Sequence, residues 1–259
     1  MLASAFLFCG MAVFQEPSLE SQFALAKQCK SAVRGTRGEA RIVALKKSAV
    51  AFRRVLNFWP GIGPVQAESA FRCAEIYRTL GDAGRARGAF EECLDRAKGT
   101  SFGPRALLEL GHLLRRQSQW GKAMARYKEV FDWPNVFLRQ ENDAREWLGR
   151  SWFSVKRGKR AAMWFSAWGM SAESALEKGR ALDWEVQAWA LAGDIRQAEK
   201  RLLVLRQLLD PLAEEPSKEG RAIQKFLKKM KSLEALKEAK WKAGRGTIKA
   251  VCPNPSLTD

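Results

Sequence analysis

The sequence predicts an all-α protein built as a solenoid of antiparallel helix pairs. Ala, Leu, Lys, Arg and Glu dominate the 259 residues, and all five favour helices. Nine Pro, two Tyr and a thin supply of Val and Thr argue against a β-rich fold, and the 46% hydrophobic content excludes a mainly disordered chain. An internal period of 37 to 38 residues favours a solenoid, whose units each pack only on their neighbours.

Four segments share this period and align without a gap inside the helix pair: residues 67–100, 104–137, 142–175 and 179–212. The first helix of each segment carries a residue near its middle that is small in three of the four: Ala74, Gly111, Gly149 and Val186. The second helix opens on an alanine: Ala86, Ala123, Ala161 and Ala198. A large apolar residue follows four positions later: Phe90, Tyr127, Phe165 and Leu202. Small residues let two helices cross closely, and the apolar spacing gives each second helix a buried stripe.

Short motifs within these segments resemble the tetratricopeptide repeat (TPR) family: Leu110-Gly111, Leu148-Gly149, Gly193-Asp194 and Trp133-Pro134. The resemblance implies a TPR-like α-solenoid that binds partners through a concave groove. Two departures stand out: the usual repeat is three or four residues shorter, and the fourth repeat has Glu185-Val186 in place of Leu-Gly. The loop style and the N-terminus are also similar to exported bacterial envelope TPR proteins, of the outer-membrane assembly lipoprotein and Tol–Pal coordinator type, which implies the periplasm.

The segments around the four repeats, which span residues 66–213, also have predicted roles. Residues 20–65 are expected to form N-terminal helices with a partial repeat, because Gly35 and Gly38 break any regular first helix. Residues 218–245 carry apolar groups at helical spacing and ten Lys or Arg against three Glu, which predicts a basic amphipathic capping helix. Residues 246–259 are expected to form a flexible tail.

The N-terminus, residues 1–16, has the pattern of a signal peptide. Its apolar run of thirteen residues, Leu2–Phe14, suits a signal-peptide core and is too short for a transmembrane span. No basic residue precedes the run, so a retained apolar helix in a cytoplasmic protein is the alternative. The predicted location is therefore outside the cytoplasm, in the periplasm.

The candidate partner-binding groove consists of first-helix residues outside the packing columns. They are Phe71, Glu75, Arg78, Arg105, Leu108, His112, Arg115, Arg116, Glu146, Arg150, Phe153, Asp183 and Gln187. Arginines mixed with apolar groups suit an extended peptide with acidic side chains. The alternative is that the arginines are ordinary solvated helix residues.

Catalytic, metal and cofactor sites are not predicted. The one histidine, His112, has no serine or cysteine nucleophile at a partnered position. The five cysteines lack the paired spacing of a zinc site. Cys73 and Cys93 fall in packing columns and are expected to be small buried hydrophobic groups, with a disulfide as the alternative for an exported protein.

The sequence therefore predicts a non-catalytic scaffold or adaptor that binds a protein or peptide, with an acidic segment as one candidate partner. The formal net charge of +17 keeps a second hypothesis open, a cytoplasmic basic repeat protein that binds RNA or another polyanion. An enzyme with a helical appendage is the third hypothesis, but little chain remains outside the repeats for a catalytic domain.

Overall fold

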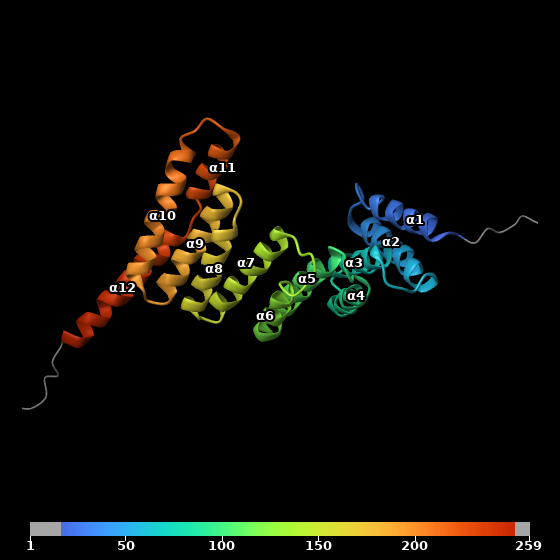
Figure 1. Cartoon of the computed structure of the whole chain (residues 1–259), viewed down its shortest axis with the longest axis horizontal. Coiled ribbons are helices and arrows are strands. Elements are labelled where there is room, and N and C mark those ends of the chain that lie inside the picture. Colours follow the sequence, from blue (N-terminus) through green and yellow to red (C-terminus); the bar gives the residue numbers. More distant parts are fainter. Residues whose placement is uncertain (1–16, 252–259) are drawn as a thin grey trace, which may run out of the picture. The chain divides into compact units, whose positions relative to one another are not determined.

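The computed structural model describes residues 17–251, and within this range it contains helices and turns but no strand (Figure 1). The described chain falls into two compact units, one ending at Arg96 and the other starting at Ala97. The predicted all-α fold of helix pairs is confirmed in each unit. The predicted signal peptide, residues 1–16, lies outside the described residues.

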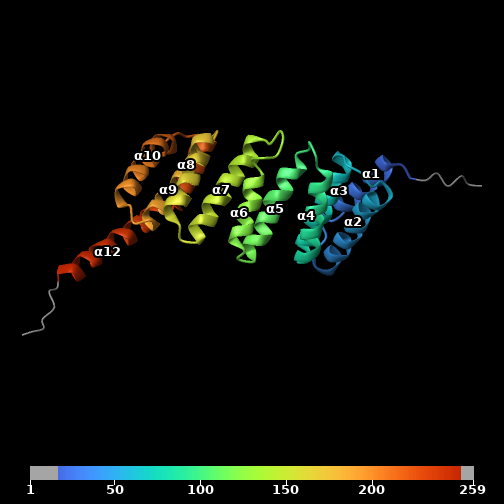
Figure 2. The ribbon, with the colours of Figure 1, turned by 60° about the horizontal axis from the view of Figure 1, so that its bottom comes forward.

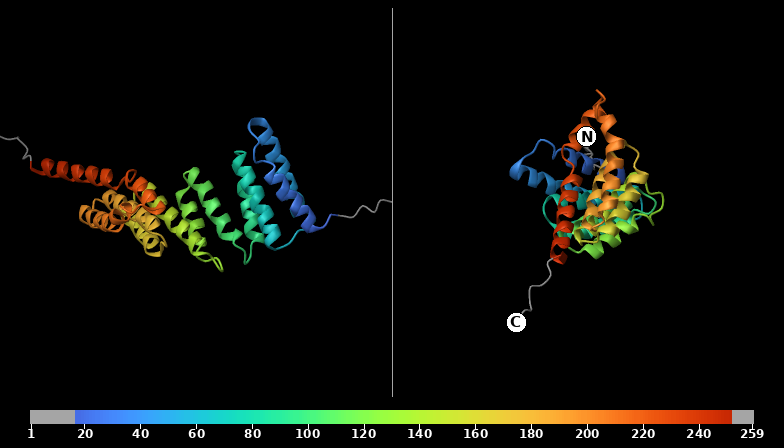
Figure 3. Two further views of the ribbon diagram at one scale, coloured as in Figure 1. Left: turned by 90° about the horizontal axis from the view of Figure 1, so that it is seen from above. Right: turned by 90° about the vertical axis from the view of Figure 1, so that its left-hand side faces the viewer.

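The first unit consists of two antiparallel helix pairs: α1 (Leu19–Ser31), α2 (Gly38–Phe58), α3 (Pro64–Thr79) and α4 (Ala83–Arg96) (Figure 3). The sequence predicted only a partial repeat before residue 65, but α1 and α2 form a complete pair. Gly35 and Gly38 do not interrupt a helix: Gly35 lies in the α1–α2 turn with φ of +85°, and Gly38 is the first residue of α2, with φ of +55°. Phe23 of α1 meets Phe52 of α2 edge to face, with ring centroids 6.2 Å apart.

The second unit continues the pairing and ends in two further helices. Its elements are α5 (Phe102–Arg116), α6 (Trp120–Glu129), α7 (Leu138–Ser154), α8 (Gly158–Ser171), α9 (Ala175–Leu191), α10 (Ile195–Ala213), α11 (Lys218–Leu227) and α12 (Ser232–Val251) (Figure 2). The pairs α5–α6, α7–α8 and α9–α10 coincide with the second, third and fourth aligned segments. The alanines that open the second helices of this unit, Ala123, Ala161 and Ala198, are fully buried.

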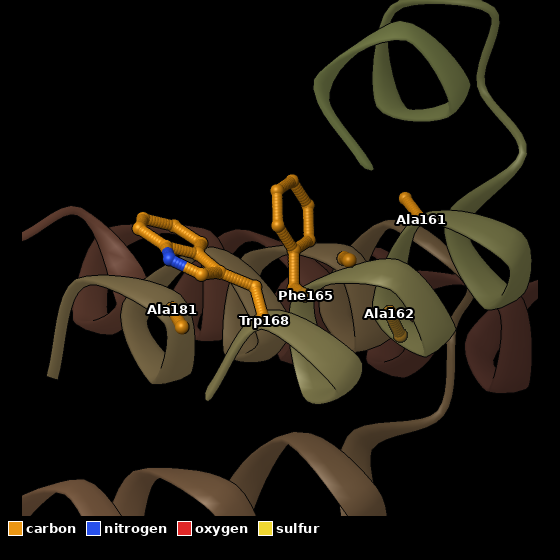
Figure 4. Packing of buried hydrophobic residues seen from close by; sticks show 6 residues of the cluster. Ala161, Ala162, Phe165, Trp168 and Ala181 are labelled. Carbon is orange, nitrogen blue, oxygen red and sulfur yellow. The ribbon is translucent and has the colours of Figure 1, made fainter. Parts of the chain in front are cut away.

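Each glycine in the middle of a first helix makes room for the aromatic ring of its partner helix. A Cβ atom at Gly111 would lie 2.3 Å from the Tyr127 ring, and one at Gly149 would lie 2.5 Å from the Phe165 ring. Phe165 and Trp168 project from the same side of α8 into the buried cluster that includes Ala161 and Ala181 (Figure 4). The predicted small-residue column therefore sets the distance between the two helices of these pairs.

In the fourth repeat, different residues stand at the contact between the first and second helices, α9 and α10. Val186 occupies the glycine position and is fully buried. Glu185, whose side chain is 3% exposed, accepts an ion pair from Arg201 of α10 at 2.9 Å. Burial raises the pKa of Glu185, and Arg201 opposes that rise. A charged pair thus replaces the apolar contact that leucine makes at this position in the second and third repeats.

We expect Gly158→Ala to destabilise the second unit by about 2 kcal/mol, because overpacking against backbone cannot be relieved by a rotamer change. A Cβ at this first residue of α8 would lie 2.5 Å from the Ala188 carbonyl oxygen of α9 and 2.7 Å from the nitrogen of Ala192, which caps that helix. Gly121→Ala in the first turn of α6 is the matched control, because no atom lies within 4 Å of its added Cβ. Chemical denaturation should show a loss for the first variant and no loss for the second; equal effects would contradict this packing.

The C-terminal segment differs from the single capping helix predicted over residues 218–245. It forms α11 and α12, which are separated at residues 228–231. Met230 is buried beside Leu205 and Leu209 of α10, whereas Leu236 packs against Ala190 of α9. The chain turns between the two helices so that both apolar surfaces are covered. The predicted flexible tail starts too early, since α12 continues through Val251; residues 252–259 lie outside the described residues.

Candidate functional site

Arginine and tryptophan side chains alternate across the three first helices of the second unit. The Arg115 guanidinium of α5 lies 4.5 Å from the Trp147 ring centroid of α7. Arg150 of α7 lies between two rings, 4.6 Å from the centroid of Trp147 and 4.7 Å from that of Trp184 on α9. We call Arg115, Trp147, Arg150 and Trp184 the first-helix stack. Cation–π contacts on both faces hold the Arg150 guanidinium in one plane.

The polar atoms of the two stacked arginines are only partly used within the chain. Arg150 pairs with Glu146, one helical turn earlier, at 3.3 Å. The Nε atoms of Arg115 and Arg150 are buried and have no hydrogen-bond partner within residues 17–251. Contacts to a ligand would therefore come from the terminal guanidinium nitrogens, which can bind a carboxylate with two parallel hydrogen bonds.

Two half-buried carboxyl groups of α7, Asp143 and Glu146, lie on the helix that carries Trp147 and Arg150. Burial raises the pKa of Glu146, which the nearby Arg150 opposes. Burial also raises the pKa of Asp143, one turn before Glu146. A small cavity of about 290 Å³ lies beside them and is lined by Glu146, Arg150, Trp168, Arg180, Asp183, Trp184 and Phe226. Because an ionised carboxylate costs free energy where it is partly buried, the nearby Arg150 guanidinium stabilises the ionised form of Glu146.

His112 supports the stack through its contacts with Tyr127 and Trp147. Its Nδ1 atom lies 2.8 Å from the Tyr127 hydroxyl of α6, and its ring meets the Trp147 ring edge to face at 4.6 Å. Burial raises the pKa of Tyr127, and Arg115 opposes the rise. The Tyr127 hydroxyl holds the His112 ring, and the His112 ring in turn packs against Trp147 and helps to fix its position.

The other predicted groove residues of α5 and α7 divide between the stack and its surroundings. Phe153 meets the Trp184 ring edge to face at 5.6 Å and extends the aromatic surface. Arg105 lies 5.4 Å from the Phe102 ring centroid, away from the stack. Leu108 is 7% exposed and belongs to the core, whereas Arg116 is exposed.

Asp183 and Gln187 were predicted to line the groove, but the C-terminal helices of the chain cover them. Each is 7% exposed. Asp183 accepts hydrogen bonds from the Ser232 backbone N–H at 3.0 Å and from the Gln187 side chain at 2.9 Å. Burial raises the pKa of Asp183, and the bonds from Ser232 oppose that rise. This part of α9 is an internal contact, because α12 starts against it.

The three predicted groove residues of the first unit have different environments. Phe71 is 2% exposed and packs edge to face on Phe90, so it is a core residue. Glu75 accepts ion pairs from Lys30 at 2.9 Å and Arg72 at 2.8 Å. Although burial raises the pKa of Glu75, these two partners hold it below its usual value. Arg78 lines a cavity between α1, α2 and α3.

The cysteines of the described chain are free thiols. Cys73 and Cys93 are fully buried, and each bonds a different backbone carbonyl, that of Ala49 at 3.6 Å and that of Ala67 at 3.3 Å. Burial raises the pKa of Cys73 to about 12, which keeps the thiol protonated. Within residues 17–251, no group of three or more His, Cys, Asp or Glu side chains is placed to hold a metal ion. No helix there has the length and hydrophobicity needed to cross a bilayer.

Solved structures of other proteins contain a similar arrangement of helix pairs. No family model matches the sequence, and no curated protein matches it. Among solved structures, the chain is similar to a MamA protein, with a TM-score of 0.58 and 14% identity over 76% of this chain and 97% of that one. It is also similar to YrrB, described as a TPR protein with an unusual peptide-binding site, with a TM-score of 0.53 and 13% identity over 74% of this chain and 87% of that one.

A third structure has the same organisation, a putative kinesin light chain from Podosopora anserina with nearly identical TPR-like repeats. Its TM-score is 0.55, with 14% identity over 78% of this chain and all of that one. This chain has the tetratricopeptide repeat fold. The predicted likeness to TPR proteins is confirmed, and the longer period of 37 to 38 residues is accommodated within it. In TPR terms, the first-helix stack joins the first helices of three consecutive repeats.

Proposed function

We propose that this TPR protein is a non-catalytic scaffold whose second unit binds an acidic, extended segment of a protein partner. The first-helix stack carries the proposal. Arg115 and Arg150 are held by tryptophan rings, so binding a carboxylate costs little side-chain entropy. Trp147 offers apolar contact area between the two positive charges, and Trp184 and Phe153 offer more beyond Arg150; all three are half-buried.

A titration with a labelled peptide of alternating glutamate and leucine tests the proposal. We expect the Arg115→Glu/Arg150→Glu variant to bind it at least about tenfold more weakly, because two charge-assisted contacts become repulsive. Lys122→Glu/Lys128→Glu is the control of equal charge change, since both lysines are exposed on α6. Equal weakening in both variants, or binding of the matching glutamine–leucine peptide with the same affinity, would contradict a specific role for the stack.

Glu146→Gln is expected to strengthen binding of the same acidic peptide several-fold. Glu146 now competes for Arg150, and the neutral amide would release the guanidinium to the ligand. Glu141→Gln is the matched control, because Glu141 pairs at 2.8 Å with Arg145, outside the stack. Fluorescence anisotropy should show tighter binding only for the first variant; weaker binding would mean that Glu146 contacts the ligand itself.

We further propose that the scaffold works in the bacterial cell envelope. The apolar run Leu2–Phe14 supports this, since its length suits an export signal. N-terminal sequencing of the mature protein should find that the run has been removed. An intact N-terminus would favour the cytoplasmic, polyanion-binding alternative, for which binding would fall steeply as salt concentration rises.

A further inference from the structure

The first unit contains an open cavity of about 560 Å³ between α1, α2 and α3, separate from the first-helix stack. Six cationic side chains line it: Lys27, Lys30, Arg34, Arg41, Arg72 and Arg78. Only two carboxylates share the lining, Glu68 and Glu75, which leaves an excess of four positive charges. Cavities of this size accept small-molecule ligands in other proteins.

Part of this charge forms a closed network on one wall. Lys30 and Arg72 both bond Glu75, at 2.9 Å and 2.8 Å, and Arg72 also bonds Glu68 at 2.9 Å. The two cations and two anions of this network balance. It joins α1 to α3 and fixes the wall of the cavity.

Three of the remaining cations are not neutralised. Lys27, Arg34 and Arg41 are exposed, and no carboxylate lies within 4.0 Å of their charged atoms in the described part of the chain. Lys27 instead lies 4.5 Å from the Phe23 ring centroid. These cations come from α1, from the α1–α2 turn and from α2, so three backbone segments place them around one space. Like charges gathered in this way repel one another until an anion binds.

The cavity also has an apolar floor. Val33, Leu45, Phe52 and Ile76 line it and are themselves at least nine-tenths buried. A ligand that matches both features combines a charge-dense anionic group with an apolar or aromatic body. A phosphoryl group concentrates its charge and three acceptor oxygens in one place, whereas the carboxylates of an extended peptide are spread along the chain.

We propose that this cavity binds a phosphate-bearing ligand, with the phosphoryl group held by Lys27, Arg34 and Arg41 and the organic body on the apolar floor. The site lies wholly within the first unit and is independent of the proposed peptide-binding stack. Arginine is suited to this role because its planar guanidinium binds phosphate oxygens in pairs.

Isothermal titration of the full chain with ATP and with inorganic pyrophosphate tests the site, alongside sedimentation with phosphatidylcholine vesicles that contain or lack phosphatidic acid. Binding of the soluble compounds would identify a free phosphate ester as the source, and binding only to phosphatidic acid vesicles would identify a lipid headgroup. We expect Arg34→Ala/Arg41→Ala to weaken that binding at least about tenfold. Both arginines are exposed, so the variant should keep the wild-type circular dichroism spectrum.

Lys47→Ala/Arg54→Ala removes two exposed charges from α2 outside the cavity and should leave the affinity unchanged. Equal weakening in the two variants would show unspecific attraction to a basic surface and overturn the proposal. The absence of binding to all the phosphate probes would overturn it as well. So would displacement of a bound probe by the glutamate–leucine peptide, because that peptide is assigned to the other unit.

Discussion

Replacing Phe165 with alanine is expected to lower the free energy of unfolding of the second unit by about 4 kcal/mol, the range for large buried aromatic residues. The ring is fully buried, stacks on Trp184 with centroids 5.4 Å apart, and occupies the space that Gly149 leaves open. Neither neighbour can fill the cavity without moving a helix. The variant therefore loses both the apolar contact and the spacing of the α7–α8 pair.

Urea denaturation followed by tryptophan fluorescence measures this loss, because all but one of the ten tryptophans belong to the second unit. Met163→Ala is the control on the same helix, since Met163 is 69% exposed and its truncation should cost almost nothing. Phe165→Ala should also weaken peptide binding, because Trp184 contributes to the first-helix stack. A change in stability below about 1 kcal/mol would show that the third repeat is not packed as described.

Arg201→Ala is expected to have the second largest effect, about 2 to 3 kcal/mol, because it leaves the buried Glu185 carboxylate without its positively charged partner. The magnitude is at the low end for such pairs, because the Arg201 side chain is 34% exposed and solvent screens part of the attraction. Glu185→Leu restores the residue type of Leu110 and Leu148 in the aligned repeats. The double variant should therefore recover most of the stability lost by Arg201→Ala.

The loss in Arg201→Ala should depend on pH in a defined direction. Burial already raises the pKa of Glu185 in the folded protein, and removal of Arg201 raises it further. The folded state then binds a proton more readily than the unfolded state, so stability is greatest below the unfolded pKa and falls as pH rises through the folded pKa. Thermal melts should thus show a larger deficit at neutral pH than under mildly acidic conditions. A deficit that grows on acidification would contradict this account.

The helix pairs could be predicted from the sequence because the signal is local and repeated. The alanines that open the second helices recur at fixed spacing, and each is fully buried. The Glu185–Arg201 pair broke the pattern at the position where the sequence departs from the other repeats. The departure from leucine at this aligned position therefore corresponds to a change in the structure, from an apolar contact to a buried ion pair.

The candidate site could be predicted only in part. Arg115 and Arg150 were identified, but Trp147 was not, because its column holds Arg72 and Glu109 in the first two repeats and a tryptophan, Trp184, only in the fourth. The covering of Asp183 by Ser232 left no signal in the sequence, because one backbone hydrogen bond between distant residues has no period. Residues that act between repeats depend on tertiary contacts that spacing alone does not specify.

The central claim is that an acidic peptide binds on the first-helix stack, and tryptophan indole signals in a nitrogen-15 NMR titration test it directly. With the glutamate–leucine peptide, the indole N–H signals of Trp147 and Trp184 should shift together and saturate at one ligand per chain. The signal of Trp59, which follows α2 in the first unit, should stay in place. Shifts confined to tryptophans outside the stack, or no shift of Trp147 at saturating peptide, would contradict the claim.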